Sequence, residues 1–295
     1  MDATPIQAKQ LLVRTKEGNK WFGIDYNLNL YRGCSHGCIY CDSRSECYQN
    51  NDFDRVQYKE NAIDLLYKEI ASKNRHSVIG FGSMSDPYNP IEKELELTKK
   101  ALEVLDYYQM GAILITKSDL ILRDLAILKR IHTHSPLCVI FTITTTHEAL
   151  QKKLEPHVTT TQDRLKAIKK LSDQGIPCGV LMMPIIPFIN DTLENIESIV
   201  HRSKESGAFF VYPSFGVTLR DRQRDYFYQM IDREFPGLKN VYMDTFGNRY
   251  SCQSPKAAEL KRAFVFECRK QKLFYGMNDI VQTIKPTKSK QLTLF

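Results

Sequence analysis

The sequence predicts an α/β fold built on a parallel sheet that closes into a barrel or partial barrel. Six short apolar runs rich in β-forming residues alternate with six longer stretches of helical period. Strand-helix units in series imply parallel strands joined by crossover helices. The runs are nearly continuous in apolar character, which is typical of strands buried on both faces. A doubly wound open sheet has the same pattern and stays an alternative.

The predicted elements follow one another without a long break. The expected strands span residues 28–31, 77–81, 112–116, 137–144, 177–183 and 208–213. The expected helices span residues 62–73, 91–108, 119–131, 161–175, 192–207 and 220–235. Gly175 and Gly207 suit helix ends, because glycine readily adopts the left-handed conformation that follows a helix. In such a fold the chemistry belongs at the carboxyl ends of the strands, where polar segments follow the predicted strands.

The chain of 295 residues is long enough to bury a sizeable core. We expect four parts: an N-terminal extension (1–27), the strand-helix domain (28–238), a C-terminal α/β extension (239–284) with one helix at 255–271, and a flexible tail (285–295). The longest apolar run, 179–189, contains two prolines and is too short to span a bilayer. No secretory signal is evident, so we expect a cytoplasmic protein without a membrane partner. The net charge of +7 is a mild indication of a polyanionic partner.

Three of the eight cysteines lie close together after the first predicted strand, in the order Cys34-x3-Cys38-x2-Cys41. Three thiolates from one loop can ligate one inorganic centre. Zinc in a closed structural site needs four ligands, so the fourth would be His36, Cys47 or a distant residue. An iron–sulfur cubane held by three cysteines keeps one iron open, as a catalytic site requires. The spacing favours the cluster and leaves zinc as an alternative.

The triplet, with Tyr40 before its last cysteine, resembles the cluster motif of the radical S-adenosylmethionine (SAM) superfamily. Over about residues 28–215 the chain looks like the spore photoproduct lyase-like proteins of that superfamily. The segments that carry this resemblance are YRGCSHGCIYC, SDPYNPIEKELELT, ITKS with RDL, TITTT, KLEP with RL, and GIPCGVLMMPIIPFIND. The resemblance implies a partial (β/α)6 barrel of the radical SAM type, similar to a TIM barrel, with a C-terminal extension.

The resemblance also implies the cofactors. Cys34, Cys38 and Cys41 would ligate a [4Fe–4S] cluster, and its open iron would chelate SAM. An electron from a separate donor would cleave SAM to methionine and a 5′-deoxyadenosyl radical, which would abstract a hydrogen atom from the substrate. His36 is expected to be a loop residue rather than an iron ligand, because three cysteines already complete the pattern.

Six polar residues that follow or end predicted strands are candidates for contacts to SAM: Ser83, Ser85, Asp86, Lys117, Thr142 and Thr144. The carboxylate and the two serines could accept from the SAM ammonium group, although Ser-Asp-Pro also commonly starts a turn. The lysine could pair with the SAM carboxylate or be solvated. The threonines share one strand face and could reach the ribose, or only favour the strand. Arg164 is expected at the surface.

One position departs from the lyase pattern. Ser83 stands where, by our alignment, spore photoproduct lyase has a cysteine that donates a hydrogen atom. An O–H bond is too strong to take that role readily. The resemblance therefore supports the radical machinery better than the lyase's own substrate, unless Cys47, Cys178 or a tyrosine is the donor.

The chain ends in QLTLF after the basic spacer KPTKSK. This pentapeptide resembles the motif with which bacterial proteins dock on the DNA sliding clamp. Leu292, Leu294 and Phe295 would be its apolar anchors, and Gln291 would make polar contacts. An apolar end that folds onto the domain is the alternative.

Together these features predict a radical SAM enzyme that acts on nucleic acid, with damaged or modified DNA as the favoured substrate. Two alternatives stay open. The first is a radical SAM enzyme for a small molecule, a peptide or RNA. The second is a zinc-containing nucleic-acid-binding module without redox chemistry, which would not need so large a strand-helix domain.

Overall fold

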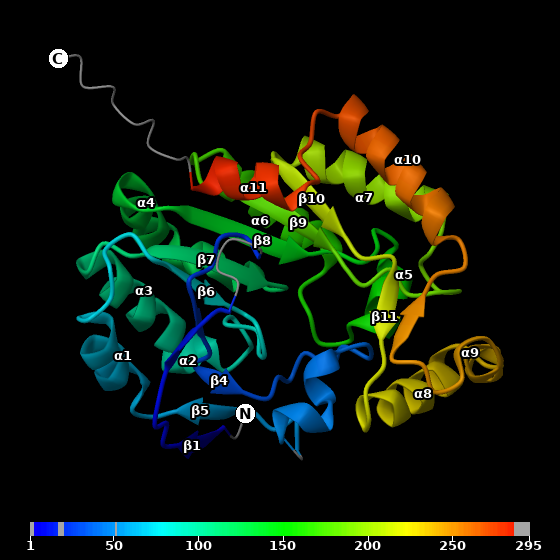
Figure 1. Cartoon of the computed structure of the whole chain (residues 1–295), viewed down its shortest axis with the longest axis horizontal. Coiled ribbons are helices and arrows are strands. Elements are labelled where there is room, and N and C mark those ends of the chain that lie inside the picture. The colour runs from blue at the N-terminus through cyan, green and yellow to red at the C-terminus, as the bar shows by residue number, and fades with distance from the viewer. Residues whose placement is uncertain (1–2, 17–20, 51, 286–295) are drawn as a thin grey trace.

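The central element of the protein is a seven-stranded sheet, shown in Figure 1. The computed structural model describes residues 3–16, 21–50 and 52–285. The order of the strands is β10-β9-β8-β7-β6-β3-β2. Their bounds are β2 (Leu12–Arg14), β3 (Tyr26–Leu28), β6 (Val78–Phe81), β7 (Gly111–Thr116), β8 (Leu137–Thr142), β9 (Cys178–Met182) and β10 (Phe210–Pro213).

The strand order decides between the two predicted architectures. All neighbouring pairs from β3 to β10 are parallel, and only β2 is antiparallel, at the edge. The six parallel strands lie side by side in chain order, without the reversal that defines a doubly wound sheet. The predicted partial (β/α)6 barrel is therefore confirmed.

Crossover helices cover the outer face of this sheet. Their bounds are α1 (Ala62–Ile70), α2 (Glu92–Leu95), α3 (Leu97–Tyr107), the 3-10 helix η3 (Asp119–Asp124), α4 (Leu125–His134), α6 (Thr161–Ser172) and α7 (Leu193–Glu205). The short helix α5 (Glu148–Leu154) packs instead, through Leu154, with Ile39 and Tyr40 of the cysteine loop. One large core joins the crossover helices to the alternate strand residues that point outward, such as Leu114 and Phe141. Gly207 follows α7 with φ +87°, as predicted for a helix end.

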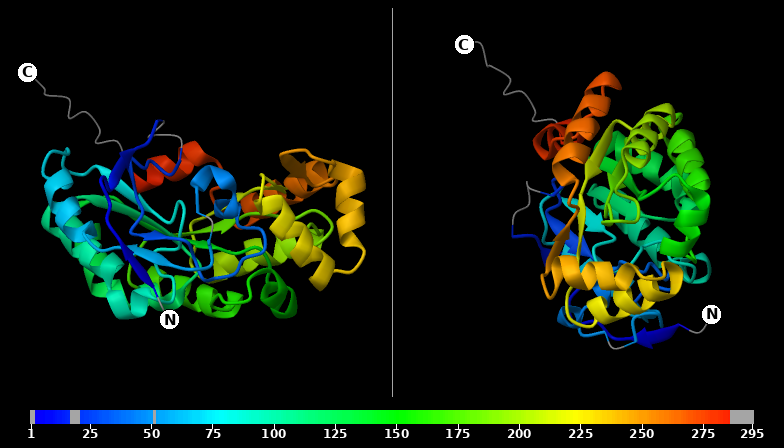
Figure 2. Two further views of the ribbon diagram at one scale, coloured as in Figure 1. Left: turned by 90° about the horizontal axis from the view of Figure 1, so that it is seen from below. Right: turned by 90° about the vertical axis from the view of Figure 1, so that its right-hand side faces the viewer.

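The inner face of the sheet is closed by segments far apart in the chain. Inward-pointing residues of five strands pack with Phe22, Ile24 and α11 (Met277–Ile284) in a second core. Figure 2 shows α11 on the opposite side of the sheet from the crossover helices. Gly179 of β9 makes this packing possible, because a Cβ atom there would lie 1.9 Å from the ring of Phe210.

Two smaller sheets and the C-terminal helices complete the fold. The first small sheet contains β1 (Thr4–Ile6), β5 (Gln57–Lys59) and β4 (Tyr31–Arg32), and the second contains β11 (Gly216–Thr218) and β12 (Ser251–Gln253). The remaining helices are α8 (Gln223–Glu234), α9 (Leu238–Phe246) and α10 (Ala257–Lys270). The predicted strand 28–31 is wrong in detail, because the chain leaves β3 after Leu28 and Tyr31 pairs instead with Tyr58 of β5.

The predicted clamp-binding residues lie outside the described part of the chain. They are Gln291, Leu292, Leu294 and Phe295. The sliding clamp therefore stays a prediction. Among the described helices, none is long and apolar enough to cross a membrane.

Candidate active site

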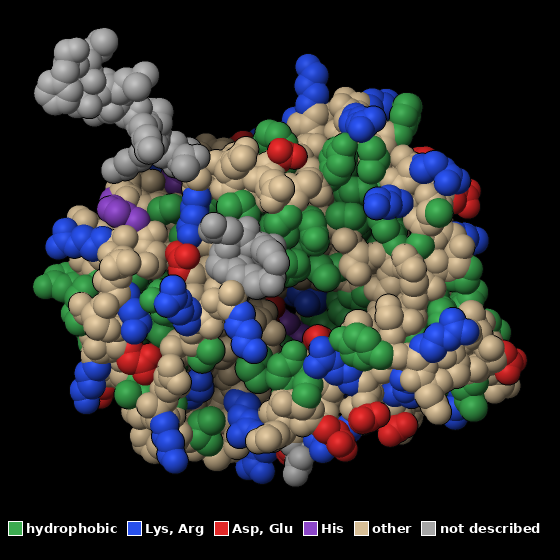
Figure 3. Space-filling view, in the orientation of Figure 1, with side chains coloured by type: hydrophobic (Ala, Val, Ile, Leu, Met, Phe, Trp, Pro, Cys, Tyr) green, Lys and Arg blue, Asp and Glu red, His purple; other side chains and the backbone are tan. Residues whose placement is uncertain are grey.

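A cavity of about 380 Å³ lies at the carboxyl ends of the parallel strands. Its walls come from the loop that follows β4, from the loop after β6, from the ends of β7, β8 and β9, and from residues 214–218. It contains these residues predicted from the sequence: Cys34, Cys38, Cys41, Ser83, Ser85, Asp86, Lys117 and Thr142. Figure 3 shows a hollow on this face of the molecule, with basic and histidine side chains at its floor.

The loop with the three cysteines is held by the backbone on both sides. The N–H of Cys34 donates to the carbonyl of Phe53 at 2.9 Å, and that of Ile39 donates to the carbonyl of Leu154 at 3.0 Å. Gly33, at φ +79°, passes so close to the neighbouring segment that a Cβ atom would lie 2.6 Å from the Phe53 carbonyl oxygen. The tight loop therefore directs the thiols toward the cavity, and each of the three lines it.

The three thiols differ in their surroundings. Burial raises the pKa of a thiol, but the charge and hydrogen bond of His36 outweigh this effect and lower the pKa of Cys34. Burial dominates at the other two thiols, and it raises the pKa of Cys41 to about 11 and that of Cys38 well above its ordinary value. Binding of a metal centre would release protons here, because only a thiolate is a metal ligand.

Asp86 joins three parts of the site. Its carboxylate accepts hydrogen bonds from the hydroxyl of Thr116 at 2.6 Å, from the N–H of Tyr88 at 2.9 Å and from the N–H of Lys117 at 2.7 Å. One carboxylate oxygen lies 3.5 Å from Nδ1 of His36 in the cysteine loop. The loop after β6, the end of β7 and the cysteine loop are thus fixed relative to one another. His36 is buried between the Asp86 carboxylate and the thiol of Cys34, with which its ring forms a hydrogen bond.

The two serines of the same segment face different partners. The hydroxyl of Ser85 is buried and donates to the carbonyl of Gly33 at 2.6 Å, which ties this segment to the start of the cysteine loop. The hydroxyl of Ser83 is exposed and donates to the side chain of Asn29 at 3.0 Å. Ser85 therefore positions the loop, whereas Ser83 faces the open part of the cavity.

Lys117 presents a positive charge to the cavity. Burial lowers the pKa of its ammonium group, but the charges of Cys38, Glu155 and Asp86 outweigh this effect and raise the pKa. The ammonium nitrogen lies 5.9 Å from the centre of the Tyr40 ring. No carboxylate of a described residue lies within ion-pair distance of it. The group is therefore suited to an anionic ligand.

Sequence reasoning missed a buried ion pair behind the cavity. Arg164, expected at the surface, is fully buried and pairs with Glu155, which is also fully buried. The guanidinium donates to the carbonyls of Thr142 at 2.6 Å and Thr159 at 2.8 Å. The hydroxyl of Tyr40 donates to Glu155 as well. The pair thus connects the cysteine loop to the end of β8. In the sequence, Glu155 lies in the segment KLEP and Arg164 in the segment RL.

Thr144 is the predicted site residue that the structure does not bring to the cavity. It lies beyond the end of β8, is buried, and donates to Glu155 at 3.3 Å. Thr142, the last residue of β8, does line the cavity. The alternation of a strand no longer applies after Thr142, which explains why the two threonines separate.

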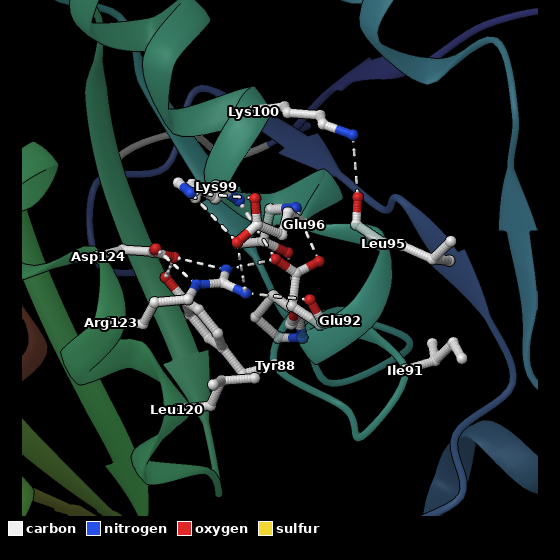
Figure 4. Close-up of polar contacts among 12 residues, drawn as sticks. Tyr88, Ile91, Glu92, Leu95, Glu96, Lys99, Lys100, Leu120, Arg123 and Asp124 are labelled. Atoms are coloured by element: carbon white, nitrogen blue, oxygen red, sulfur yellow. Dashed lines mark hydrogen bonds and ion pairs between the residues drawn. The ribbon is translucent and has the colours of Figure 1, made fainter. Parts of the chain in front are cut away.

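A second polar network fixes the loop that contains Asp86. Arg123 donates to the carboxylates of Glu92 at 2.6 Å and of Asp124 at 2.8 Å, and both acids are fully buried. Tyr88 donates to Asp124 at 3.1 Å, and the N–H of Thr98 donates to Glu92 at 2.9 Å. Figure 4 shows the side chains of Arg123, Glu92 and Asp124 converging beside Tyr88. Tyr88, Glu92 and Thr98 belong to the segment SDPYNPIEKELELT, and Arg123 and Asp124 belong to the segment RDL. These contacts explain why the two segments occur together in one chain.

Comparisons with known proteins identify the family. The family model described as the radical SAM superfamily matches residues 28–201, which contain every candidate residue of the cavity named above. This chain belongs to the radical SAM superfamily. An uncharacterised protein of Methanocaldococcus jannaschii is 32% identical to this radical SAM protein over 223 residues, which cover 74% of this chain and 81% of that protein. An uncharacterised protein of Mycobacterium tuberculosis is 28% identical over 228 residues, or 75% of this chain and 67% of that protein.

Solved structures confirm the fold of this radical SAM enzyme. A form of spore photoproduct lyase with bound AdoMet and a dinucleoside spore photoproduct superposes with a TM-score of 0.65, over 92% of this chain and 82% of the lyase, at 14% identity. The radical SAM methyltransferase TsrM from Kitasatospora setae, with tryptophan and a SAM analogue, gives a TM-score of 0.54. That match covers 83% of this chain and 51% of TsrM at 11% identity. The predicted spore photoproduct lyase-like fold is confirmed.

Proposed function

We propose that this radical SAM enzyme holds a [4Fe–4S] cluster on Cys34, Cys38 and Cys41, binds SAM in the adjoining cavity and acts on a nucleic-acid lesion. One observation carries the proposal. Three thiols, a buried carboxylate and a lysine without a carboxylate partner among the described residues line the same cavity at the carboxyl edge of the sheet. A reduced cluster supplies the electron that cleaves SAM.

The donor set fits a cluster better than a zinc ion. In a cubane each thiolate ligates a different iron, whereas the ligands of one zinc ion converge on one point at about 2.3 Å. Within the described residues, no three His, Cys, Asp or Glu side chains are arranged to hold a single ion. All eight cysteines lie in the described part and are free thiols, so the triplet is available as ligands.

The remaining groups of the cavity suit the two charges of the SAM amino-acid moiety. Lys117 would pair with the carboxylate, and Asp86 would attract the ammonium group with the lone pairs that its present hydrogen bonds leave. The hydroxyl of Thr142 would lie at the ribose. Ser85 would act indirectly, by keeping the cysteine loop in place.

The proposed substrate class depends on charge and on a structural neighbour. The net charge of +7 favours a polyanion. The lyase of similar fold was solved with a dinucleoside spore photoproduct. A radical SAM enzyme for a small molecule is the second candidate, since TsrM of similar fold was solved with tryptophan.

The hydrogen-atom donor of the lyase has no thiol counterpart at Ser83. Among the described residues, the cysteines that line the cavity are those of the triplet. The Sγ atom of Cys47 contacts Arg220 at 2.9 Å outside the cavity, and Cys178 is buried in the outer core. We therefore expect the product to be completed without a separate cavity thiol.

The test is anaerobic reconstitution with iron and sulfide, followed by SAM and dithionite. Iron, acid-labile sulfide and 5′-deoxyadenosine are measured for the wild type and for Cys34→Ala, Cys38→Ala and Cys41→Ala. Cys47→Ala is the matched control, because it removes a thiol outside the cavity. We expect the three triplet variants to lose the cluster and 5′-deoxyadenosine, and the control to retain both. A wild type that binds zinc, takes up no iron and leaves SAM intact would contradict the proposal.

A further inference from the structure

The cavity has one wall that takes no part in the SAM contacts proposed above. Trp21, the single tryptophan of the chain, lines the cavity together with Leu181 and Met183. Trp21 is 38% exposed as a residue, whereas the neighbouring Phe22 is fully buried. The indole thus belongs to the open part of the site. Figure 3 shows apolar side chains along the rim of the hollow.

The indole of Trp21 packs against two other aromatic rings. Its centroid lies 4.8 Å from the ring of Phe22 and 5.8 Å from that of Tyr212, both in edge-to-face geometry. The backbone is fixed by a hydrogen bond from the N–H of Ile24 to the Trp21 carbonyl at 3.1 Å. Phe22 is anchored in turn against Phe210 in the inner core. A rigid indole of this kind can receive a planar ligand at little entropic cost.

The size of the cavity indicates what such a ligand would be. A volume of about 380 Å³ is near the lower end for a single small-molecule site, roughly 300–1,000 Å³. SAM would occupy much of this space beside the thiols, Asp86 and Lys117. A second molecule must then reach in from the exposed side, where Trp21 lies.

We propose that Trp21 is the stacking platform for a base of the nucleic-acid substrate. The inference rests on the proposed function and names the residue that positions the substrate. Aromatic side chains bind exposed bases by stacking, largely irrespective of sequence. Loss of one such platform weakens binding by about 1–3 kcal/mol, which is roughly 5- to 150-fold in affinity.

The single tryptophan gives a direct readout. Reconstituted protein at constant cluster loading is saturated with SAM and titrated with a short thymine oligonucleotide, ultraviolet-irradiated or untreated, while the indole emission is recorded. Affinity is measured independently by the anisotropy of the same oligonucleotide carrying fluorescein. The variants are Trp21→Ala, Trp21→Phe and, as a control on a distant exposed aromatic, Phe266→Ala.

We expect the oligonucleotide to quench the indole emission and Trp21→Ala to weaken binding 5- to 150-fold. Trp21→Phe should retain most of the affinity, and Phe266→Ala should retain both the quenching and the affinity. If the oligonucleotide binds without quenching and Trp21→Ala binds equally well, the stacking role is overturned and the nucleic-acid substrate stands. If SAM alone causes the whole change in emission, Trp21 faces SAM and the inference fails.

If wild-type protein that cleaves SAM binds neither oligonucleotide, the nucleic-acid substrate itself is wrong. The indole titration and the anisotropy therefore separate failure of the stacking role from failure of the proposed function.

Discussion

At the scale of single residues, we expect the largest loss of stability when Glu155 is substituted. Its carboxylate is fully buried, accepts from Arg164 and Tyr40, and connects the cysteine loop to the end of β8. We expect Glu155→Gln to destabilise the protein by about 3–5 kcal/mol, because it leaves a buried guanidinium without its counter-charge. The measurement is chemical unfolding of the metal-free protein. Glu148→Gln, in an exposed pair with Lys152, should change stability by less than about 1 kcal/mol.

The same pair gives a defined pH dependence. Burial raises the pKa of Glu155, but Arg164 and Lys117 outweigh it and hold the pKa below its ordinary value of 4.5. The ionised form therefore contributes stability that is present above the unfolded-state pKa and is lost as the pH falls through the lower folded-state pKa. The stability difference between wild type and Glu155→Gln should shrink over that acidic range. A difference that stays constant down to full protonation would mean that the ion pair is not the cause.

Gly33 should be intolerant of any side chain. A Cβ atom there would lie 2.6 Å from the carbonyl oxygen of Phe53 and 2.8 Å from that of Arg55, and φ is +79°. We expect Gly33→Ala to cost roughly 2–4 kcal/mol and to lower the iron content after reconstitution. Gly175→Ala is the matched control, since Gly175 has φ +77° but no atom within 4 Å of its Cβ position. It should cost only about 1–2 kcal/mol and leave iron binding unchanged. Equal effects of the two variants would exclude the steric cause.

The residues that could be predicted from the sequence are those whose chemistry depends on local spacing. Cys34, Cys38 and Cys41 follow one another on one loop, so their common position was evident before the fold was known. Arg164 was placed at the surface because arginine is usually exposed. Its burial depends on Glu155, on a carbonyl of β8 and on a carbonyl of the loop before α6, and the general tendency of arginine gives no indication of these contacts.

At the scale of elements, Arg123 connects η3 to the loop that carries Asp86. Its neighbours Glu92 and Asp124 are fully buried carboxylates (Figure 4). We expect Arg123→Ala to destabilise the protein by about 3–5 kcal/mol, because two buried charges lose their partner. SAM affinity, measured by equilibrium dialysis, should fall as the loop loosens. Arg130→Ala, at a pair whose arginine side chain is 54% exposed, should cost at most about 1 kcal/mol and leave SAM affinity unchanged. An Arg123→Ala protein of wild-type stability would refute this role for the network.

Helices and strands were predicted well where the hydrophobic periodicity of the sequence is strong. The helix expected at 255–271 is α10 (Ala257–Lys270), and the runs at 112–116 and 177–183 are β7 and β9. The strand at 28–31 was harder to predict, because Leu28 pairs in the large sheet and Tyr31 pairs in a small one. A run of four residues does not show where the chain passes from one sheet to the other. Short elements such as β11 and β12 form only through their mutual pairing, which lies outside any local pattern.

At the scale of the whole molecule, the inner core explains what the sequence pattern leaves open. The repeated strand-helix units predict parallel strands but do not show what fills the inside of a partial barrel. Phe22 and Ile24 from the start of the chain and Ile280 and Ile284 from α11 fill it together. The N–H of Phe22 contacts the sulfur of Met277 at 3.2 Å, across 255 positions of sequence. Contacts over such separations follow from the closed fold and carry no local signal.

The charge of the whole molecule provides the test of the proposed substrate class. Lys and Arg side chains are distributed around the hollow in Figure 3, and the net charge is +7. A nucleic acid bound over this face would release counterions, so log K should fall linearly with log salt, with a slope of about −0.9 per phosphate contacted in duplex DNA. Anisotropy titrations of labelled, ultraviolet-irradiated DNA over a series of potassium chloride concentrations measure this slope. A small-molecule enzyme predicts no DNA binding even at low salt, while SAM cleavage persists. That result would turn the search for the substrate away from nucleic acids.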